Sequence, residues 1–141
     1  MIVQSICLSF KNELPLGLHD FTFGSGNTFK MALYTSAANL NENTLTYVTQ
    51  DEVVGAGYVA GGVVLTSVTP TLLNGTVVFD FADAVWENAT FTARGAMIYN
   101  QTSGQRSVLI LDFGSDRTAN NNTFTVTMPE ASPSDAIIRI A

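Results

Sequence analysis

The chain has 141 residues, a length typical of one domain, and its formal net charge of −6 disfavours nucleic-acid binding because phosphates require a basic surface. A single cysteine, Cys7, excludes an intrachain disulfide. No apolar run reaches the roughly 20 residues that a membrane-spanning helix needs, and no basic residue precedes Lys11 as in a secretory signal, so we expect neither a membrane anchor nor export.

The surface is expected to be poor in ionised side chains. Charged residues make up 13% of the chain, against about 25% in typical globular domains, and Thr, Asn and Ser supply the remaining polarity. Because the centres of protein interfaces are depleted in charge, this composition favours a protein that assembles with other protein molecules. A bland Thr/Asn surface on a monomeric β domain is the alternative.

Residues 1–14 are predicted to form a short amphipathic helix or an N-terminal arm. Apolar residues recur there at helical spacing, and Pro15 ends the pattern. The residues of this apolar face are Val3, Ile6, Cys7, Phe10 and Leu14.

Residues 28–141 are predicted to form a β core, because apolar and polar residues alternate through much of this region. Asn74-Gly75 suits both positive-φ positions of a type I′ hairpin turn, and the four glycines of 51–62 indicate a long loop. The expected strands are 29–35, 45–49, 63–69 (ended by Pro70), 76–81, 89–100, 107–113, 123–128 and 136–140, with turns at 102–105 and 120–122. The whole chain, 1–141, is therefore predicted to be one all-β domain. Its expected architecture is an antiparallel sandwich or barrel of about 7–9 strands with a short N-terminal helix.

Possible catalytic and ligand-binding motifs are weak. Asp112-Phe113-Gly114 matches the metal-binding tripeptide of protein kinases but lacks the accompanying motifs, so it is interpreted as a strand end entering a turn. The glycines of 55–61 precede a β segment rather than the helix that a dinucleotide fingerprint requires. Asp80 with Asp83, and Asp112 with Asp116, are interpreted as turn caps at strand ends rather than as acid/base pairs or calcium ligands.

The remaining candidates also favour structural roles. His19, the only histidine, has Asp20 beside it but no nucleophile elbow in the chain, and Cys7 is expected to lie in the core. The aromatic residues Tyr34, Tyr58, Trp86, Phe91 and Tyr99 are expected to pack internally rather than to form a sugar-stacking face. No catalytic residue, cofactor site or metal ligand is predicted, and we expect that the protein is not an enzyme.

Eight stretches carry a resemblance that spans nearly the whole chain: Phe10–Leu14, His19–Phe21, Thr28–Ala38, Gly57–Gly62, Phe81–Trp86, Thr92–Asn100, Leu109–Gly114 and Ala136–Ile140. As a set they resemble a family of small structural proteins of tailed bacteriophages and prophages. The resemblance implies a non-enzymatic virion component assembled in the bacterial cytoplasm, and it brings no catalytic residues.

Together with the charge pattern, this leads us to expect a capsid decoration (cement) protein that binds the major capsid protein from outside as a homo-oligomer, with a trimer favoured. Residues 1–14 or the glycine loop 51–62 would be the arm that reaches the shell or a neighbouring copy. A tail tube, collar or fibre-attachment protein is one alternative, and a carbohydrate-binding adhesion module on the virion is another.

Overall fold

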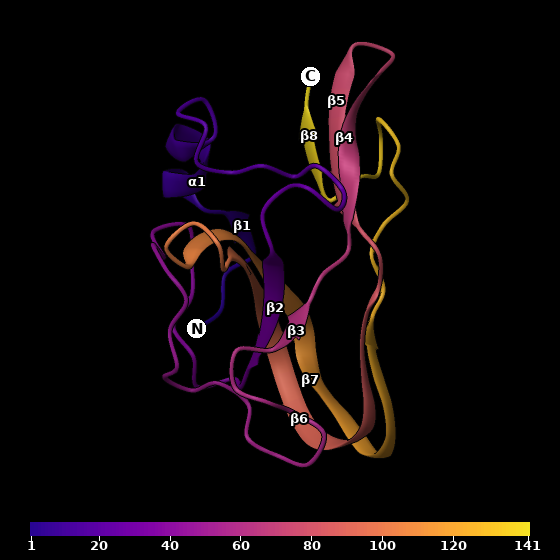
Figure 1. Ribbon diagram of the computed structural model, residues 1–141. Coiled ribbons are helices and arrows are strands. Elements are labelled where there is room, and N and C mark those ends of the chain that lie inside the picture. Colours follow the sequence, from indigo (N-terminus) through magenta and orange to yellow (C-terminus); the bar gives the residue numbers. More distant parts are fainter.

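Two long antiparallel strands dominate the computed structural model, which describes residues 1–141 (Figure 1). They belong to a five-stranded sheet of order β1-β7-β6-β2-β3, and a second sheet has the order β4-β5-β8. The elements are β1 (Ser5–Ile6), α1 (Leu8–Glu13), β2 (Phe29–Tyr34), β3 (Val63–Val64), β4 (Ser67–Leu73), β5 (Thr76–Phe81), β6 (Ala84–Asn100), β7 (Arg106–Val126) and β8 (Ile138–Ile140). The all-β prediction is confirmed, and of the two expected architectures the open sandwich fits, because both sheets have free edges.

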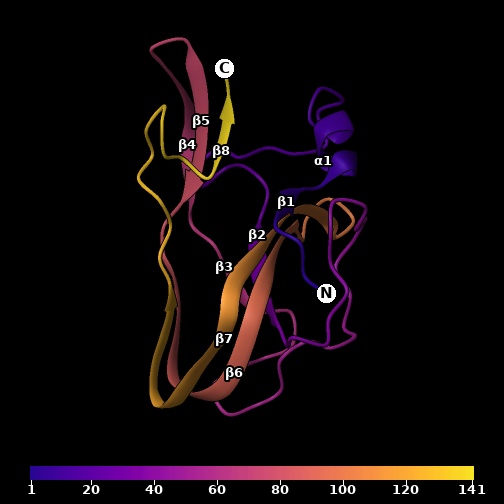
Figure 2. The ribbon, with the colours of Figure 1, turned by 180° about the vertical axis from the view of Figure 1, so that it is seen from behind.

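Strands β6 and β7 form a ribbon that bends back on itself, at the bottom of Figures 1 and 2. β-Bulges between Trp86 and Ala89 and between Ala93 and Gly95 accompany the bend. Bulges add residues to one strand and increase its local twist while pairing continues on both sides. The first half of β6 therefore pairs with the second half of β7 in one wall of the sandwich. In the opposite wall, the second half of β6 pairs with the first half of β7 on one side and with β2 on the other.

This ribbon corrects two predictions made from the sequence. The strand does not end at Asp112-Phe113-Gly114, because β7 continues through it to Val126. No turn forms at 120–122, which lies inside β7. Gly114 and Asn121 do adopt the positive φ that is typical of turns, 80° and 52°, but both lie within a continuous strand.

The hydrophobic core lies between the walls of this ribbon and extends beneath the loops that connect the other strands. It contains 31 buried apolar residues. At one end the rings of Phe21 and Phe29 stack and the Phe81 ring is tilted against both, and the other end contains Trp86, Phe91 and Phe124. The expectation that aromatic residues pack internally is confirmed for the buried Tyr34, Trp86, Phe91 and Tyr99.

The N-terminal segment is helical over only six residues, Leu8–Glu13, rather than over 1–14. Ser5 and Ile6 instead pair with Ile110 and Leu109 of β7. Val3, predicted on the buried helical face, has an exposed fraction of 46%. An unpaired edge of β7 offers backbone hydrogen bonds to this segment, and its β-branched residues favour the extended conformation. Cys7 and Phe10 are buried, as predicted.

The connection 63–75 also differs from prediction in one respect. The expected strand 63–69 is divided between β3 in the large sheet and β4 in the small one, and β4 continues through Pro70 to Leu73. Pro70 is tolerated because β4 is an edge strand and a bulge lies between Val68 and Thr71. The Asn74-Gly75 turn is confirmed, with φ values of 48° and 81°.

Two shorter segments are reduced from what the sequence predicts. Residues 45–49 form no strand, and their only bridge joins Thr46 to Arg106. The final strand covers Ile138–Ile140 rather than 136–140.

Candidate interaction surfaces

The three-stranded sheet of β4, β5 and β8 projects from the body, and we call it the arm. The tip of its β4–β5 hairpin is the uppermost part of the molecule in Figures 1 and 2. The hairpin segment 67–79 contains no charged residue. Leu72, next to the tip, has an exposed fraction of 68%. The other large apolar side chains exposed on the arm are Val68, Leu73 and Ile140.

The base of the arm is anchored in the core. Phe79 and Phe81 of β5 lie against the ring of Phe21, with the Phe79 and Phe21 rings edge to face at 5.1 Å. Edge-to-face aromatic pairs of this kind add about 0.5–1.5 kcal/mol beyond the area that they bury. The arm is therefore fixed at its base while its tip remains exposed.

At this base, neither Asp80 nor Asp83 caps a turn as predicted. Asp80 lies inside β5, where one carboxylate oxygen accepts a hydrogen bond from the Phe81 N–H at 2.8 Å and the other has no partner. Burial raises the pKa of the Asp80 carboxyl above its ordinary value. Asp83 accepts a hydrogen bond from the Met128 N–H at 2.7 Å and so ties the segment after β7 to the β5–β6 connection.

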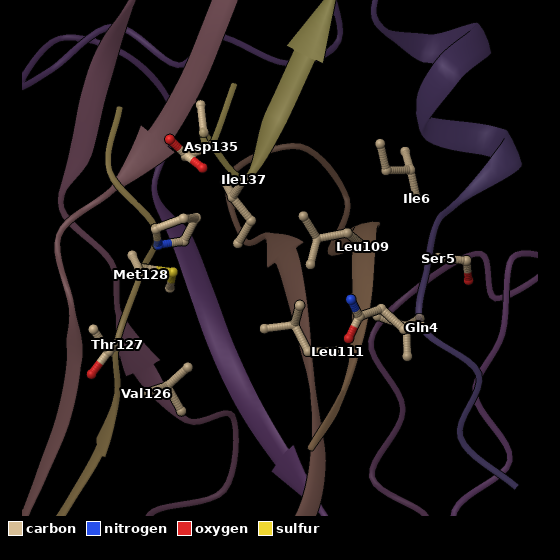
Figure 3. Close-up of a pocket in the computed structure, with 13 residues that line it drawn as sticks. Gln4, Ser5, Ile6, Leu109, Leu111, Val126, Thr127, Met128, Asp135 and Ile137 are labelled. Atoms are coloured by element: carbon tan, nitrogen blue, oxygen red, sulfur yellow. The ribbon is translucent and has the colours of Figure 1, made fainter. Parts of the chain in front are cut away.

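An apolar groove of about 490 Å³ lies between β1 and β7 on one side and the segment from Val126 to Ile137 on the other (Figure 3). Side chains of Leu109 and Leu111 on β7 face those of Val126 and Ile137 across it. The remaining residues that line the groove are Gln4, Ser5, Ile6, Ile110, Thr127, Met128, Pro129, Asp135 and Ala136. Sequence analysis did not predict this groove, because its walls come from three separate segments of the chain.

Asp135 is the one ionisable side chain that lines the groove. Its carboxylate accepts hydrogen bonds from the hydroxyls of Ser132 and Ser134, both at 2.9 Å, and these bonds lower its pKa. The Asp135 carboxylate is therefore fixed at the rim of the groove by serines of the same loop, and the floor of the groove is apolar.

The glycine loop 51–62 is packed against the strands instead of extending as an arm. The Val53 N–H donates to the Leu33 carbonyl at 2.9 Å, and the Thr90 N–H donates to the Ala56 carbonyl at 2.9 Å. Gly62, at φ +82°, lies so close to β2 that an added Cβ would meet the Met31 carbonyl oxygen at 1.7 Å. The loop is therefore fixed, and it presents Val54, with an exposed fraction of 94%, on its outer side.

A buried carboxylate holds this loop. Glu52, with an exposed fraction of 8%, accepts hydrogen bonds from the hydroxyls of Tyr47 at 2.7 Å and Tyr58 at 2.6 Å, and from the Gly61 N–H at 2.8 Å. Burial raises the pKa of both tyrosines above the ordinary value, and hydrogen bonding to Glu52 adds to the shift. The Tyr99 hydroxyl donates to the Gly61 carbonyl at 2.7 Å, and burial with the nearby Glu52 charge raises its pKa to about 12.

His19 occupies a second buried polar cluster. Its Nε2 lies 2.9 Å from a Glu13 carboxylate oxygen, and its Nδ1 lies 3.1 Å from the Asn100 side-chain nitrogen. Asp20 faces elsewhere and accepts hydrogen bonds from the backbone and hydroxyl of Thr22. The neighbouring Cys7 is buried, and burial raises the pKa of its thiol. Both nitrogens of the imidazole therefore face structural partners.

Asp112 and Asp116, interpreted from the sequence as turn caps at a strand end, both lie within β7. Asp112 lies inside β7, where the Gly114 N–H and the Arg94 side chain donate to its carboxylate and lower its pKa. Asp116 is exposed. No group of three or more His, Cys, Asp or Glu side chains is arranged to hold a metal ion.

No helix has the length and apolar composition that crossing a bilayer requires. Comparison of the chain with protein-family models, with curated proteins and with solved structures finds no match.

Proposed function

We propose that this chain is a structural component of a tailed-bacteriophage particle, and that within the particle it is a decoration protein on the outer face of the capsid. Its partners would be the major capsid protein and further copies of itself. The assignment to a phage particle rests on the resemblance of the eight sequence stretches. The observation that carries the structural role is the arm, an anchored projection with exposed leucines and no charged residue in segment 67–79.

Decoration proteins act through contact area, so they need rigid surfaces that lose little entropy on binding. The arm and the fixed glycine loop both present apolar side chains on a backbone held by hydrogen bonds and ring packing. The net charge of −6 favours a site outside the shell, because packaged DNA inside would repel an acidic protein.

Two competing functions have less support. A sugar-binding face built on Trp86 is disfavoured, because Trp86 has an exposed fraction of 3% and its ring packs against Phe124. Hydrolytic catalysis is disfavoured, because the Ser107 hydroxyl donates to the Thr44 carbonyl and the His19 ring is held by Glu13 and Asn100. A tail-associated protein would use the same kind of surface, so the experiment below distinguishes a position in the tail from one on the head.

The test is to purify particles that carry this chain and to count its copies by quantitative mass spectrometry. Hundreds of copies per particle support decoration of the head, whereas a few dozen or fewer indicate the tail. Particles assembled without the protein should lose their DNA at lower temperature, and added protein should restore them. Absence of the chain from purified particles would refute the proposal.

Deleting residues 1–14, one of the two arms expected from the sequence, would be a poor test of attachment. Residues 1–14 contain the buried Cys7 and Phe10 and supply β1, so their removal would damage the fold as well as any contact. Single substitutions of exposed side chains are the better perturbation.

A further inference from the structure

We infer that the arm of one copy docks into the apolar groove of a second copy, so that the protein assembles head to tail. The inference deepens the proposed structural role by naming the partner, and it rests on that role for the expectation that the chain assembles. The two surfaces themselves come from the structure.

The tip of the arm and the groove are complementary in chemistry. The tip offers Leu72 and Leu73 beside a tight Asn74-Gly75 turn, a narrow apolar projection. The groove offers a mostly apolar lining and a volume of about 490 Å³, within the roughly 300–1,000 Å³ of clefts that bury small ligands. Two leucine side chains and a two-residue turn are of a size to enter it.

Charge argues that the occupant is a second copy. Copies with a net charge of −6 repel one another wherever their acidic surfaces meet. Segment 67–79, which forms the tip and most of the hairpin, carries no charge, and the groove has only Asp135, which accepts hydrogen bonds from two serine hydroxyls. Arm and groove are thus surfaces that identical copies can join with little like-charge repulsion and without burying an unpaired charge.

The docked contact has to extend beyond the tip of the arm. A stable interface buries about 800 Å² on each partner. That is roughly a ninth of the 7151 Å² surface of this chain. An arm that projects from the body exposes more than its tip, so the residues along β4 add to the contact once the tip is seated.

The position of the groove restricts which arm can enter it. The groove lies beside the base of β8 (Figure 3), and the tip of the arm extends away from that base (Figures 1 and 2). An arm therefore cannot fill the groove of its own chain. A contact between different patches on successive copies repeats, and it closes into a ring when the rotation between copies allows.

The test uses sedimentation velocity of the full chain over a range of concentrations, with two blocked variants. Leu72→Asp places a charge on the exposed tip and blocks the arm. Val126→Arg places a charge in the groove, toward which the Val126 side chain points (Figure 3), and blocks it. Gln4→Trp, on the exposed wall of the groove, is a second groove variant should Val126→Arg fold poorly.

Wild type should associate as concentration rises, and each blocked variant alone should lose about tenfold or more in association constant. An equal mixture of arm-blocked and groove-blocked protein should form dimers and stop there, because one intact arm and one intact groove remain. Val54→Asp, on the fixed glycine loop, is the matched control and should associate like wild type.

A wild type that remains monomeric, a groove-blocked variant that assembles as wild type does, or a mixture that stays monomeric would each overturn the inference. These outcomes are separate from the particle test. Copies found in particles together with a monomeric purified protein would refute arm-to-groove docking and leave the proposed function standing.

Discussion

Replacing Glu52 by alanine should loosen the glycine loop and destabilise the whole domain. The substitution removes the acceptor for the hydroxyls of Tyr47 and Tyr58 and for the Gly61 N–H, while all three donors remain where water reaches them poorly. Hydrogen bonds to a charged group contribute about 1.5–3 kcal/mol each, and members of one network are not additive. We therefore expect a loss of about 3–5 kcal/mol in the free energy of unfolding. For a domain of this size that lowers the melting temperature by roughly 10–20 °C.

The assay is urea and thermal unfolding followed by circular dichroism, with amide hydrogen exchange to locate the effect. The exchange of the Gly61 amide should accelerate more than that of amides in the centre of β6, because the loop opens before the sheet does. Glu130→Ala removes the same charge from an exposed position and should change stability by less than about 0.5 kcal/mol. A Glu52→Ala protein within about 1 kcal/mol of wild type would refute the claim that this carboxylate holds the loop.

Two further outcomes are expected from the same region. Gly62→Ala should lower the free energy of unfolding, measured by chemical denaturation, by more than about 4 kcal/mol or prevent folding, because the new Cβ meets the Met31 carbonyl. Gly24→Ala has a similar positive φ but open space around it, so it should cost roughly 1–2 kcal/mol. Equal losses in the two variants would show that the contact with Met31 is unimportant. Folding raises the pKa of Tyr99 from 10 to about 12, so between these pH values the folded state keeps a phenol proton that the unfolded chain has lost. The contribution of Tyr99 to stability should therefore be fully present below pH 10 and be lost as the pH rises toward 12. The fall between these pH values should be shallower in Tyr99→Phe, and an unchanged pH profile would contradict the role given to this group.

The sequence predicted local conformation better than it predicted strand continuity. The Asn74-Gly75 hairpin formed as expected, because the positive φ that both positions need is a property of the residues themselves. Gly114 and Asn121 also adopted positive φ, yet they lie in bulges of one long strand. A local signal fixes the backbone angle of a residue, whereas pairing with β6 on both sides decides whether the strand continues.

The interaction surfaces were less accessible to sequence reasoning. Low charge led to the prediction of a protein-contacting surface, but the expected arms, 1–14 and 51–62, are folded against the body. The hairpin that does project was predicted only as a hairpin. Whether a hairpin projects depends on how its base packs against the rest of the protein. Here the base is fixed by packing of Phe79 and Phe81 against Phe21.

The amino-acid sequence by itself determined the β class, the absence of a disulfide, the turn at Asn74-Gly75 and the scarcity of charge, because each follows from the chemistry or periodicity of residues near one another in the chain. Only the tertiary structure decided that β6 and β7 bend as one ribbon, that Glu52 holds the glycine loop and that Leu111 faces Val126 across a groove. These features join residues distant in sequence, and such contacts exist only after the chain has packed into one arrangement.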